Sequence, residues 1–419
     1  MPNASDDDDA PIVLRDPSTG LEAHIVRAGA SLQRLLVPVR NSDAAAGAAD
    51  GAAPATTTTL RDVVLGYDKP SDYLTVDPTC YLGAVVGRVA NRIAQARFRI
   101  GEKDFALAAN NGPNALHGGT RGLDRRRWTL VAGGDGRSAT LRYVSPAGEE
   151  GYPGTLEVEA RYRIPSGGRA ALRLEMRARC VVDDGAADAA MALPPEGTPV
   201  ALAAHSYFNL AGFVESDPFS VLGFEAGTDG KGEGAAAPPP TLLHMPRATH
   251  YTRLGAHQIP TGEVLPVAGT PFDFASAPRP LGQSAAEADP QCDRPGYDHN
   301  FVVATKSEAT APGGVLPLVG EPLPLVASLS CGTLQMDVRS NAPGVQLYTG
   351  NYLGGDDGRG DPAAPRSKGG APPYRRWSGV CLETQNWPDA VNRPGVFPSP
   401  LLKPGEEYVH VVEYSFCSV

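Results

Sequence analysis

The chain has 419 residues, 42% of them hydrophobic, and a formal net charge of −10 at pH 7. The acidic balance argues against a nucleic-acid-binding protein, because such surfaces are basic, while the hydrophobic content is enough for a large buried core. No apolar run approaches the roughly 20 residues of a membrane-spanning helix, so we expect a soluble, cytoplasmic protein with neither a nucleic acid nor a membrane as partner.

The first ten residues, MPNASDDDDA, predict a disordered acidic tail that is neither a secretion signal nor a basic transit peptide. The six cysteines are scattered without the C-x-x-C spacing of a zinc cluster, and a chain of this size needs no disulfide framework. We therefore expect reduced thiols in a reducing compartment. The cysteines are Cys80, Cys180, Cys292, Cys331, Cys381 and Cys417.

Short strands are predicted along the whole chain. Residues 12–39 are typical of an opening hairpin and a third strand, and residues 61–68 are expected to resume a strand. The clearest pattern lies in residues 155–178, where apolar and charged residues alternate on both sides of a Pro-Ser-Gly-Gly turn. Period-two alternation around a turn predicts an antiparallel hairpin with one buried face. Since no sustained helical period occurs, the fold class is predicted to be all-β.

Segments rich in alanine, glycine and proline interrupt these strands. Such segments bury too little apolar surface to offset their ordering entropy, so we interpret them as expanded loops, and the first of them as disordered. They do not have the character of linkers between domains, and residues 11–419 are therefore predicted to form a single domain. The expected insertions are residues 41–59, 183–199, 227–240, 307–324 and 354–373.

Residues 81–128 concentrate polar groups between tight turns. They contain an Asn-Arg pair, Asn91 and Arg92, then the turn Asn-Asn-Gly-Pro-Asn, then His117 followed by two glycines. Glycine turns place such side chains at the rim of a rigid sheet. From the residues alone, this stretch predicts a polar ligand site on a β scaffold.

Further polar candidates occur at strand ends. His205 follows an apolar run in AAHSYFNLAG, where a core histidine bonded to the backbone is the alternative reading. Asp298 opens the strand GYDHNFVV, either as a turn residue or as a ligand. Glu383 lies inside the apolar strand VCLETQ, where burial should raise its pKa toward the range that suits proton transfer. An ion-paired core glutamate is the other possibility.

Together these motifs resemble the aldose 1-epimerase, or galactose mutarotase, family. The resemblance rests on GAVVGRVANRI, NNGPNALHGG, HSYFNL, GYDHNF and LETQN, which occur in the family's order from about residue 20 to the C-terminus. It implies a large antiparallel β-sandwich of the galactose mutarotase type. It also implies interconversion of the α and β anomers of free hexoses such as D-galactose and D-glucose.

The resemblance further implies a role for each candidate. Ring opening needs a group that takes the proton of the C1 hydroxyl and another that protonates the ring oxygen, and no metal or redox cofactor. An aldose is the expected partner, and the protein is expected to be a monomer or a weak dimer. The implied residues are Glu383 as base, His205 as acid, His117 assisting near the ring oxygen, and Asn91, Arg92, Asp298 and Gln346 holding the sugar.

Other functions remain open at this stage. A non-catalytic sugar-binding domain could use the same scaffold, since a fold does not fix function. A hexose-6-phosphate 1-epimerase would need basic residues for the phosphate, for which Arg121 and residues 125–127 are candidates. Glycoside hydrolysis fits less well, because it usually needs two carboxylates beside the scissile bond.

Overall fold

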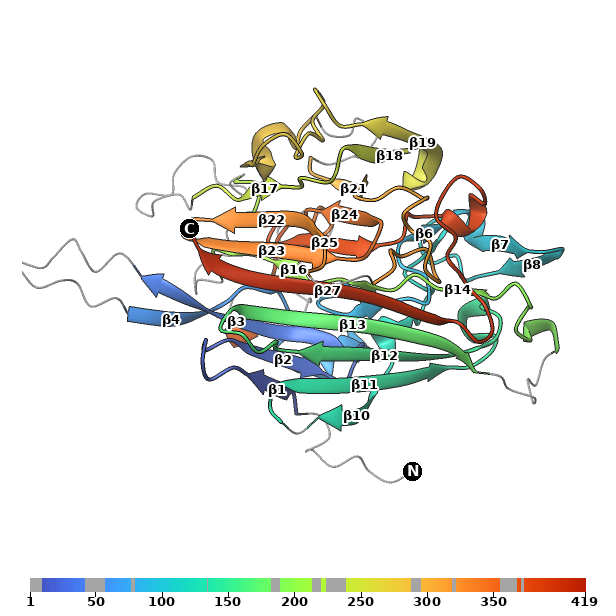
Figure 1. Cartoon of the computed structure of the whole chain (residues 1–419), viewed down its shortest axis with the longest axis horizontal. Helices are drawn as coiled ribbons and strands as arrows, with labels where there is room; N and C mark the ends of the chain where they lie inside the picture. Colours follow the sequence, from blue (N-terminus) through green and yellow to red (C-terminus); the bar gives the residue numbers. More distant parts are fainter. Residues whose placement is uncertain are drawn as a thin grey trace, which may run out of the picture.

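The structure is a computed structural model, and it describes residues 10–41, 57–76, 80–133, 135–181, 189–212, 220–223, 239–287, 295–318, 322–354, 368–370 and 373–419. Within these ranges most of the regular secondary structure is β, and the named strands pair in antiparallel fashion (Figure 1). The predicted all-β, antiparallel architecture is confirmed. In the same ranges the one α-helix is α1 (Asp72–Thr75), and no helix has the length and apolar character of a membrane span.

Three sheets make up most of the fold. The first contains β1 (Ile12–Arg15), β2 (Glu22–Val26), β3 (Ser31–Asn41) and β4 (Thr57–Asp62) in sequence order. The nine-stranded sheet has the order β10 (Thr129–Gly133), β11 (Ser138–Ser145), β12 (Thr155–Arg163), β13 (Ala170–Val181), β27 (Glu407–Ser418), β23 (Leu334–Ser340), β22 (Leu325–Cys331), β17 (Leu242–His244) and β20 (Arg279–Pro280). The six-stranded sheet has the order β16 (Tyr207–Phe208), β25 (Val380–Gln385), β24 (Gly344–Tyr348), β21 (Asp298–Val302), β18 (His250–Leu254) and β19 (Pro260–Pro266).

Short strand pairs complete the fold beside these sheets. They are β5 (Val85–Val86) with β15 (Ala203–Ala204), β6 (Arg92–Ile93) with β9 (Ala115–Leu116), β7 (Arg97–Ile100) with β8 (Lys103–Ala106), and β14 (Thr198–Pro199) with β26 (Leu401–Leu402). Several of the polar motifs predicted from the sequence lie on or next to these pairs.

The alternating segment forms the predicted hairpin, β12 with β13, at the middle of the nine-stranded sheet. Its apolar residues, such as Leu156 and Leu174, are buried in the main core. Its charged residues face outward and form cross-strand ion pairs, for example between Arg179 and Glu157. The period-two pattern therefore placed both faces of this sheet correctly.

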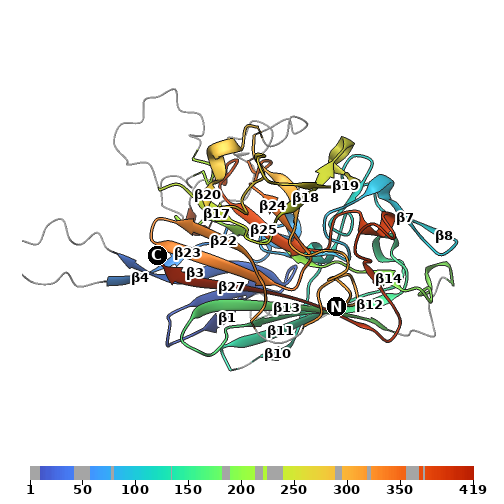
Figure 2. The same ribbon diagram turned by 45° about the horizontal axis from the view of Figure 1, so that its top comes forward.

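The main core lies between the three sheets. Figures 1 and 2 show the long strands β11, β12, β13 and β27 as one layer, with the strands of the six-stranded sheet stacked against the nine-stranded one. Leu35 from the first sheet, Leu156 from the second and Leu382 from the third belong to one continuous buried cluster. This packing of sheet on sheet is a β-sandwich.

The six-stranded sheet has two chemically different faces. Residues that pair across antiparallel strands share a face, and successive residues alternate between faces. One face carries polar side chains from three adjacent strands: Asp298, Gln346, Tyr348, Cys381 and Glu383. The other face carries the core residues Phe301, Val345, Leu347 and Leu382.

The strand expected at residues 61–68 lies earlier in the chain, as β4. The strand ends at Asp62, whose Oδ1 accepts hydrogen bonds from the backbone N–H groups of Leu35 and Val64. The tail at residues 1–9 and most of the expected insertions at 41–59, 227–240 and 354–373 lie outside the described residues.

The other two expected insertions are largely described. Of residues 183–199, positions 189–199 are described, and they end in β14. Of residues 307–324, all but 319–321 are described, and Val315 is buried in the main core. That segment is an irregular loop that packs on the sandwich, a role that its composition did not indicate.

Arg88 is a buried cation that fixes the segment immediately before Asn91 and Arg92. Only 2% of it is exposed, and burial lowers its pKa to about 10. Its guanidinium donates five hydrogen bonds, to Ser145 Oγ and to the carbonyl oxygens of residues 145, 146, 153 and 154, at 2.8–3.1 Å. Every nitrogen of the group therefore has an acceptor, as a buried charge requires.

Replacing Arg88 by methionine should destabilise the protein strongly. Arg88→Met keeps a long stem but leaves four buried carbonyl groups without these donors, and we expect a loss of about 3 kcal/mol or more. Guanidinium-chloride unfolding followed by circular dichroism measures it. Arg163→Met, at an exposed position of β12, is the matched control and should stay within about 0.5 kcal/mol of wild type. Equal losses in the two variants would contradict this role.

Candidate active site

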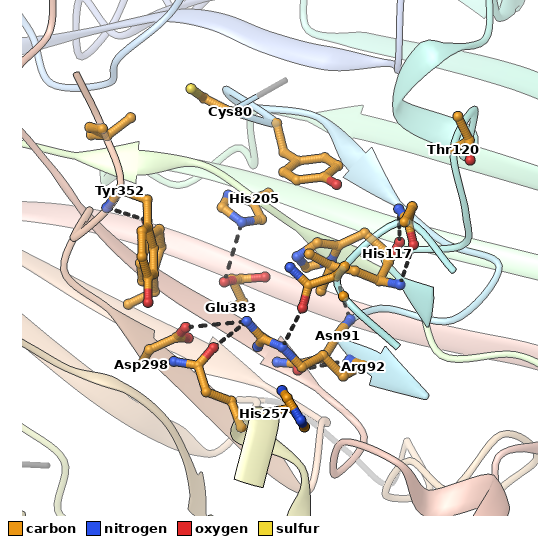
Figure 3. Close-up of a pocket in the computed structure, with 18 of the residues that line it drawn as sticks. Cys80, Asn91, Arg92, His117, Thr120, His205, His257, Asp298, Tyr352 and Glu383 are labelled. Atoms are coloured by element: carbon orange, nitrogen blue, oxygen red, sulfur yellow. Dashed lines mark hydrogen bonds and ion pairs between the residues drawn. The ribbon is translucent and has the colours of Figure 1, made fainter. Parts of the chain in front are cut away.

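A cavity of about 960 Å³ opens over the polar face of the six-stranded sheet. Its wall also contains the loops around β6, β9 and β15 and the turn between β18 and β19 (Figure 3). Six of the seven residues proposed from the sequence line it: Asn91, Arg92, His117, His205, Asp298 and Glu383. The seventh, Gln346, lies behind them and donates its Nε2 to Asp298 Oδ1 at 2.7 Å.

Glu383 lies in the middle of β25, opposite Gln346 of β24, and is only 2% exposed. Its Oε1 is 3.6 Å from Nε2 of His205. Its Oε2 has no hydrogen-bond partner in the part of the chain that the structure describes. A buried carboxylate oxygen without a partner is costly, and at a cavity wall it is available to a hydroxyl group of a ligand.

His205 lies between β15 and β16, with its ring among aromatic side chains. The ring centroids of Tyr81 and Tyr207 are 5.5 and 5.0 Å from that of the imidazole. Nδ1 is 3.5 Å from Sγ of Cys381, whose pKa burial raises well above its usual value, so the thiol keeps its proton. A neutral ring with its proton on Nδ1, toward this sulfur, leaves Nε2, the atom that faces Glu383, free to exchange a proton on that side.

His117 is held in one tautomer by the backbone of Asn91. The N–H of Asn91 donates to Nδ1 of His117 at 3.2 Å, and the N–H of His117 donates to the carbonyl of Asn91 at 3.1 Å. Burial is the main cause that lowers the pKa of His117 well below 6.5, and the nearby His205 and Arg92 lower it further. The ring is therefore neutral at pH 7. Because Nδ1 accepts, Nε2 carries the proton and is a donor.

The glycine after His117 is required by a close backbone approach. Gly118 has φ of 90°, and a Cβ atom there would lie 1.8 Å from the carbonyl oxygen of Gly87. No other residue fits this space or readily adopts this conformation. The His-Gly-Gly motif therefore brings the imidazole and the Asn91 strand together.

Arg92 is held by amide oxygen acceptors from two separate parts of the chain. Its Nε donates to Oδ1 of Asn111 at 3.0 Å, and its Nη2 donates to Oε1 of Gln258. The same Nη2 is 3.9 Å from Oδ2 of Asp298, beyond direct hydrogen-bond distance. Arg92 and Asp298 thus face the cavity as separate groups.

The charges of Glu383 and His205 are controlled mainly by loss of water. Burial raises the pKa of Glu383 well above 4.5, Asp298 raises it further, and Arg92 opposes both effects. Burial also lowers the pKa of His205 to about 4. The two shifts favour the same state, a protonated carboxyl group beside a neutral imidazole. The pair therefore holds one proton that both groups can carry.

Two histidines and a carboxylate are also a common ligand set for zinc and iron. The possible ligand atoms of His117, His205 and Glu383 lie within 4.8 Å of one another. Ligands around tetrahedral zinc lie about 3.4 Å apart when each bond is about 2.1 Å, so a metal would have to draw the groups together. The spacing fits proton transfer through a bound molecule better.

Several lining residues were not found from the sequence. Tyr81 packs against both His117 and His205, and Asn111 and Gln258 contact Arg92. Asn111 belongs to the Asn-Asn-Gly-Pro-Asn turn, and this motif could have indicated that the residue lies at the site. Gln258 lies 166 residues from Arg92, and nothing in the local pattern indicates that contact. Arg125, a candidate for phosphate binding, lines the cavity and donates to the carbonyl of Val76 at 2.8 Å.

Comparison with known protein families gives extended matches. Residues 11–225 and 244–415 match the model of the aldose 1-epimerase family. The chain is 39% identical to the galactose mutarotase of Bos taurus over 355 residues, 85% of this chain and 84% of that protein, and 38% identical to that of Homo sapiens with the same coverage. It is 31% identical to the aldose 1-epimerase of Escherichia coli K12 over 368 residues, 87% of each chain.

Solved structures show the same fold. An aldose epimerase homologue from C. elegans superposes with a TM-score of 0.71 at 21% identity, covering 98% of this chain and 99% of that one. The galactose 1-epimerase from Lactobacillus acidophilus gives a TM-score of 0.68 at 22% identity, covering 100% of this chain and 97% of that one. The predicted galactose mutarotase-like sandwich is thereby confirmed.

The buried carboxyl group should make the wild-type protein less stable than its amide variant. Because the pKa of Glu383 is raised in the folded state, its penalty is absent below the unfolded value of about 4.5 and grows as the pH rises toward the folded value. We expect Glu383→Gln to have the same melting temperature as wild type near pH 4 and a higher one at pH 8, as measured by calorimetry. Glu102→Gln, on the exposed β7–β8 turn, should show no such gain. A variant that melts below wild type at pH 8 would contradict this.

Proposed function

The chain belongs to the aldose 1-epimerase family and is an isomerase that interconverts the anomers of aldoses, and we propose that Glu383 and His205 perform this reaction on free hexoses such as D-galactose and D-glucose. The observation that carries the assignment is the buried pair itself. Among the described residues one oxygen of this carboxyl group has no hydrogen-bond partner, and it and an imidazole 3.6 Å from the same group face one cavity.

In the proposed reaction, Glu383 takes the proton of the C1 hydroxyl while His205 gives a proton to the ring oxygen. The bond between C1 and the ring oxygen breaks, and the sugar opens to the free aldehyde. Rotation about C1–C2 presents the other face of the aldehyde, and ring closure reverses both proton transfers. Each group must act as both acid and base, which suits a pair that shares one proton.

The pKa shifts of Glu383 and His205 favour the protonation state that this pair has after the sugar ring opens. Before ring opening, proton transfer requires an ionised Glu383 and a charged His205. After it, the carboxyl group is protonated and the imidazole is neutral, which is the state that burial stabilises. Burial therefore disfavours the charged pair that begins the reaction and stabilises the neutral pair that ring opening produces.

The remaining polar groups are proposed to hold the sugar. His117 offers a donor at Nε2, next to His205, and is proposed to assist at the ring oxygen. Arg92 and Asn91 are proposed as donors to hydroxyl groups. Asp298 is proposed as an acceptor of two hydroxyl protons, with Gln346 fixing its orientation through the 2.7 Å hydrogen bond.

We further propose that residues 11–419 form one domain and that the protein acts in the cytoplasm as a monomer or weak dimer. The continuous core across all three sheets supports a single domain. The five cysteines in the described ranges are free thiols, which fits a reducing compartment; Cys292 lies outside those ranges.

Polarimetry tests the assignment of Glu383. Wild-type protein should accelerate the mutarotation of freshly dissolved α-D-galactose and α-D-glucose over the spontaneous rate. Glu383→Gln should lower kcat by about 10²-fold or more, because a positioned base contributes about 10²- to 10⁴-fold. Sugar binding, measured by calorimetry, should remain.

Glu102→Gln serves as the control with the same chemical change outside the cavity, and its kcat should equal that of wild type. Unchanged turnover in Glu383→Gln would remove Glu383 as the base. An active site that binds sugar but gives no acceleration even in wild type would instead indicate the non-catalytic sugar-binding domain.

A further inference from the structure

The turn between β18 and β19 forms one wall of the cavity. Gly255, Ala256, His257 and Gln258 all line it. His257 and Gln258 both have φ of 57°, in the left-handed region that residues with a Cβ atom rarely adopt. Two consecutive residues of this kind, neither glycine nor asparagine, indicate that the turn is held in place for a reason other than its own local preference.

The turn is anchored on both sides. The carbonyl of His257 accepts from Nδ2 of Asn114 at 3.5 Å, and the carbonyl of Pro260 accepts from Nη2 of Arg393 at 2.6 Å. These contacts fix the backbone from which the Gln258 side chain extends. That side chain places its Oε1 against Nη2 of Arg92.

Two acceptors compete for the same Nη2 group. Gln258 is neutral and bonds to it directly, whereas Asp298 is a carboxylate and lies 3.9 Å away. A bidentate ion pair is the favoured arrangement of an arginine and a carboxylate that are free to meet. In such a pair, the N–H groups of Arg92 and the carboxylate oxygens of Asp298 would bind each other. Neither would then be available to a hydroxyl group of the sugar.

We propose that Gln258 is a positioning residue that keeps Arg92 apart from Asp298, so that both groups remain available to the hydroxyl groups of the sugar. Asn111 holds the Nε side of the same guanidinium and completes the arrangement. The inference rests on the proposed function, since it concerns how the same cavity binds an aldose.

Gln258→Asn is the sharpest test. Asparagine adopts positive φ more readily than glutamine, so the turn is retained, but its amide is one methylene too short to make the same contact. Losing a hydrogen bond to a charged group should raise the KM for D-galactose about tenfold or more, with kcat within about threefold. Gln258→Gly, which also accepts this backbone conformation, should give the same KM change and guards against a folding defect in either variant.

Gln95→Asn is the matched control. Gln95 also has positive φ, at 55°, but it is exposed and does not line the cavity. The same shortening there should leave KM unchanged. A rise in KM equal to that of Gln258→Asn would show that the effect comes from the backbone and would overturn the proposal.

A double-mutant cycle shows whether Gln258 acts through Arg92. If it does, Gln258→Asn should change KM by less than about twofold when Arg92 is already methionine, because the shared contact is gone. Full additivity would overturn the proposal. Wild-type KM in Gln258→Asn, with wild-type protein active, would also overturn it, whereas an inactive wild-type protein would contradict the proposed function itself.

Discussion

The burial of the Glu383 carboxyl group in the middle of a sheet is the constraint on which the site depends. A strand interior excludes water, and this raises the pKa of the carboxyl group and leaves one of its oxygens without a partner among the described residues. The surrounding sandwich makes that burial possible, because the opposite face of the same strand lies in the main core. A polar face on a fully buried sheet is costly to fold, and here it is the floor of the cavity.

Four buried side chains show three ways of handling charge without water. Arg88 keeps its charge and surrounds it with carbonyl oxygens, so it is structural and fully satisfied. Glu383 and His205 reduce their charge by sharing one proton. Arg92 keeps its charge but is held mainly by neutral amide oxygens, which leaves it attractive to a ligand. The buried charge whose hydrogen bonds are all made, Arg88, stabilises the fold. The side chains with incomplete hydrogen bonding face the cavity.

The sequence allowed the fold class and most of the site to be predicted, for different reasons. The β12–β13 hairpin follows from alternation, since one buried face imposes period two. His117, His205, Asp298 and Glu383 were found because they belong to recognisable motifs. Arg88 and Cys381 lie within those motifs, yet their roles depend on which carbonyl groups or rings pack around them. The contact of Gln258 could not be predicted from the sequence, because a turn with positive φ places it against a residue 166 positions away.

The ion pairs on the outer face of the nine-stranded sheet have a consequence for folding. In the native register, Glu159 pairs with Arg177 and Arg161 with Glu175. A slip by two residues would keep every apolar side chain on the inner face, so burial alone cannot reject it. That slip would set Glu159 against Glu175, or in the other direction Arg161 against Arg177, and like charges directly opposite repel. The surface charges thus disfavour the two slipped registers during strand pairing. Added salt would weaken this effect.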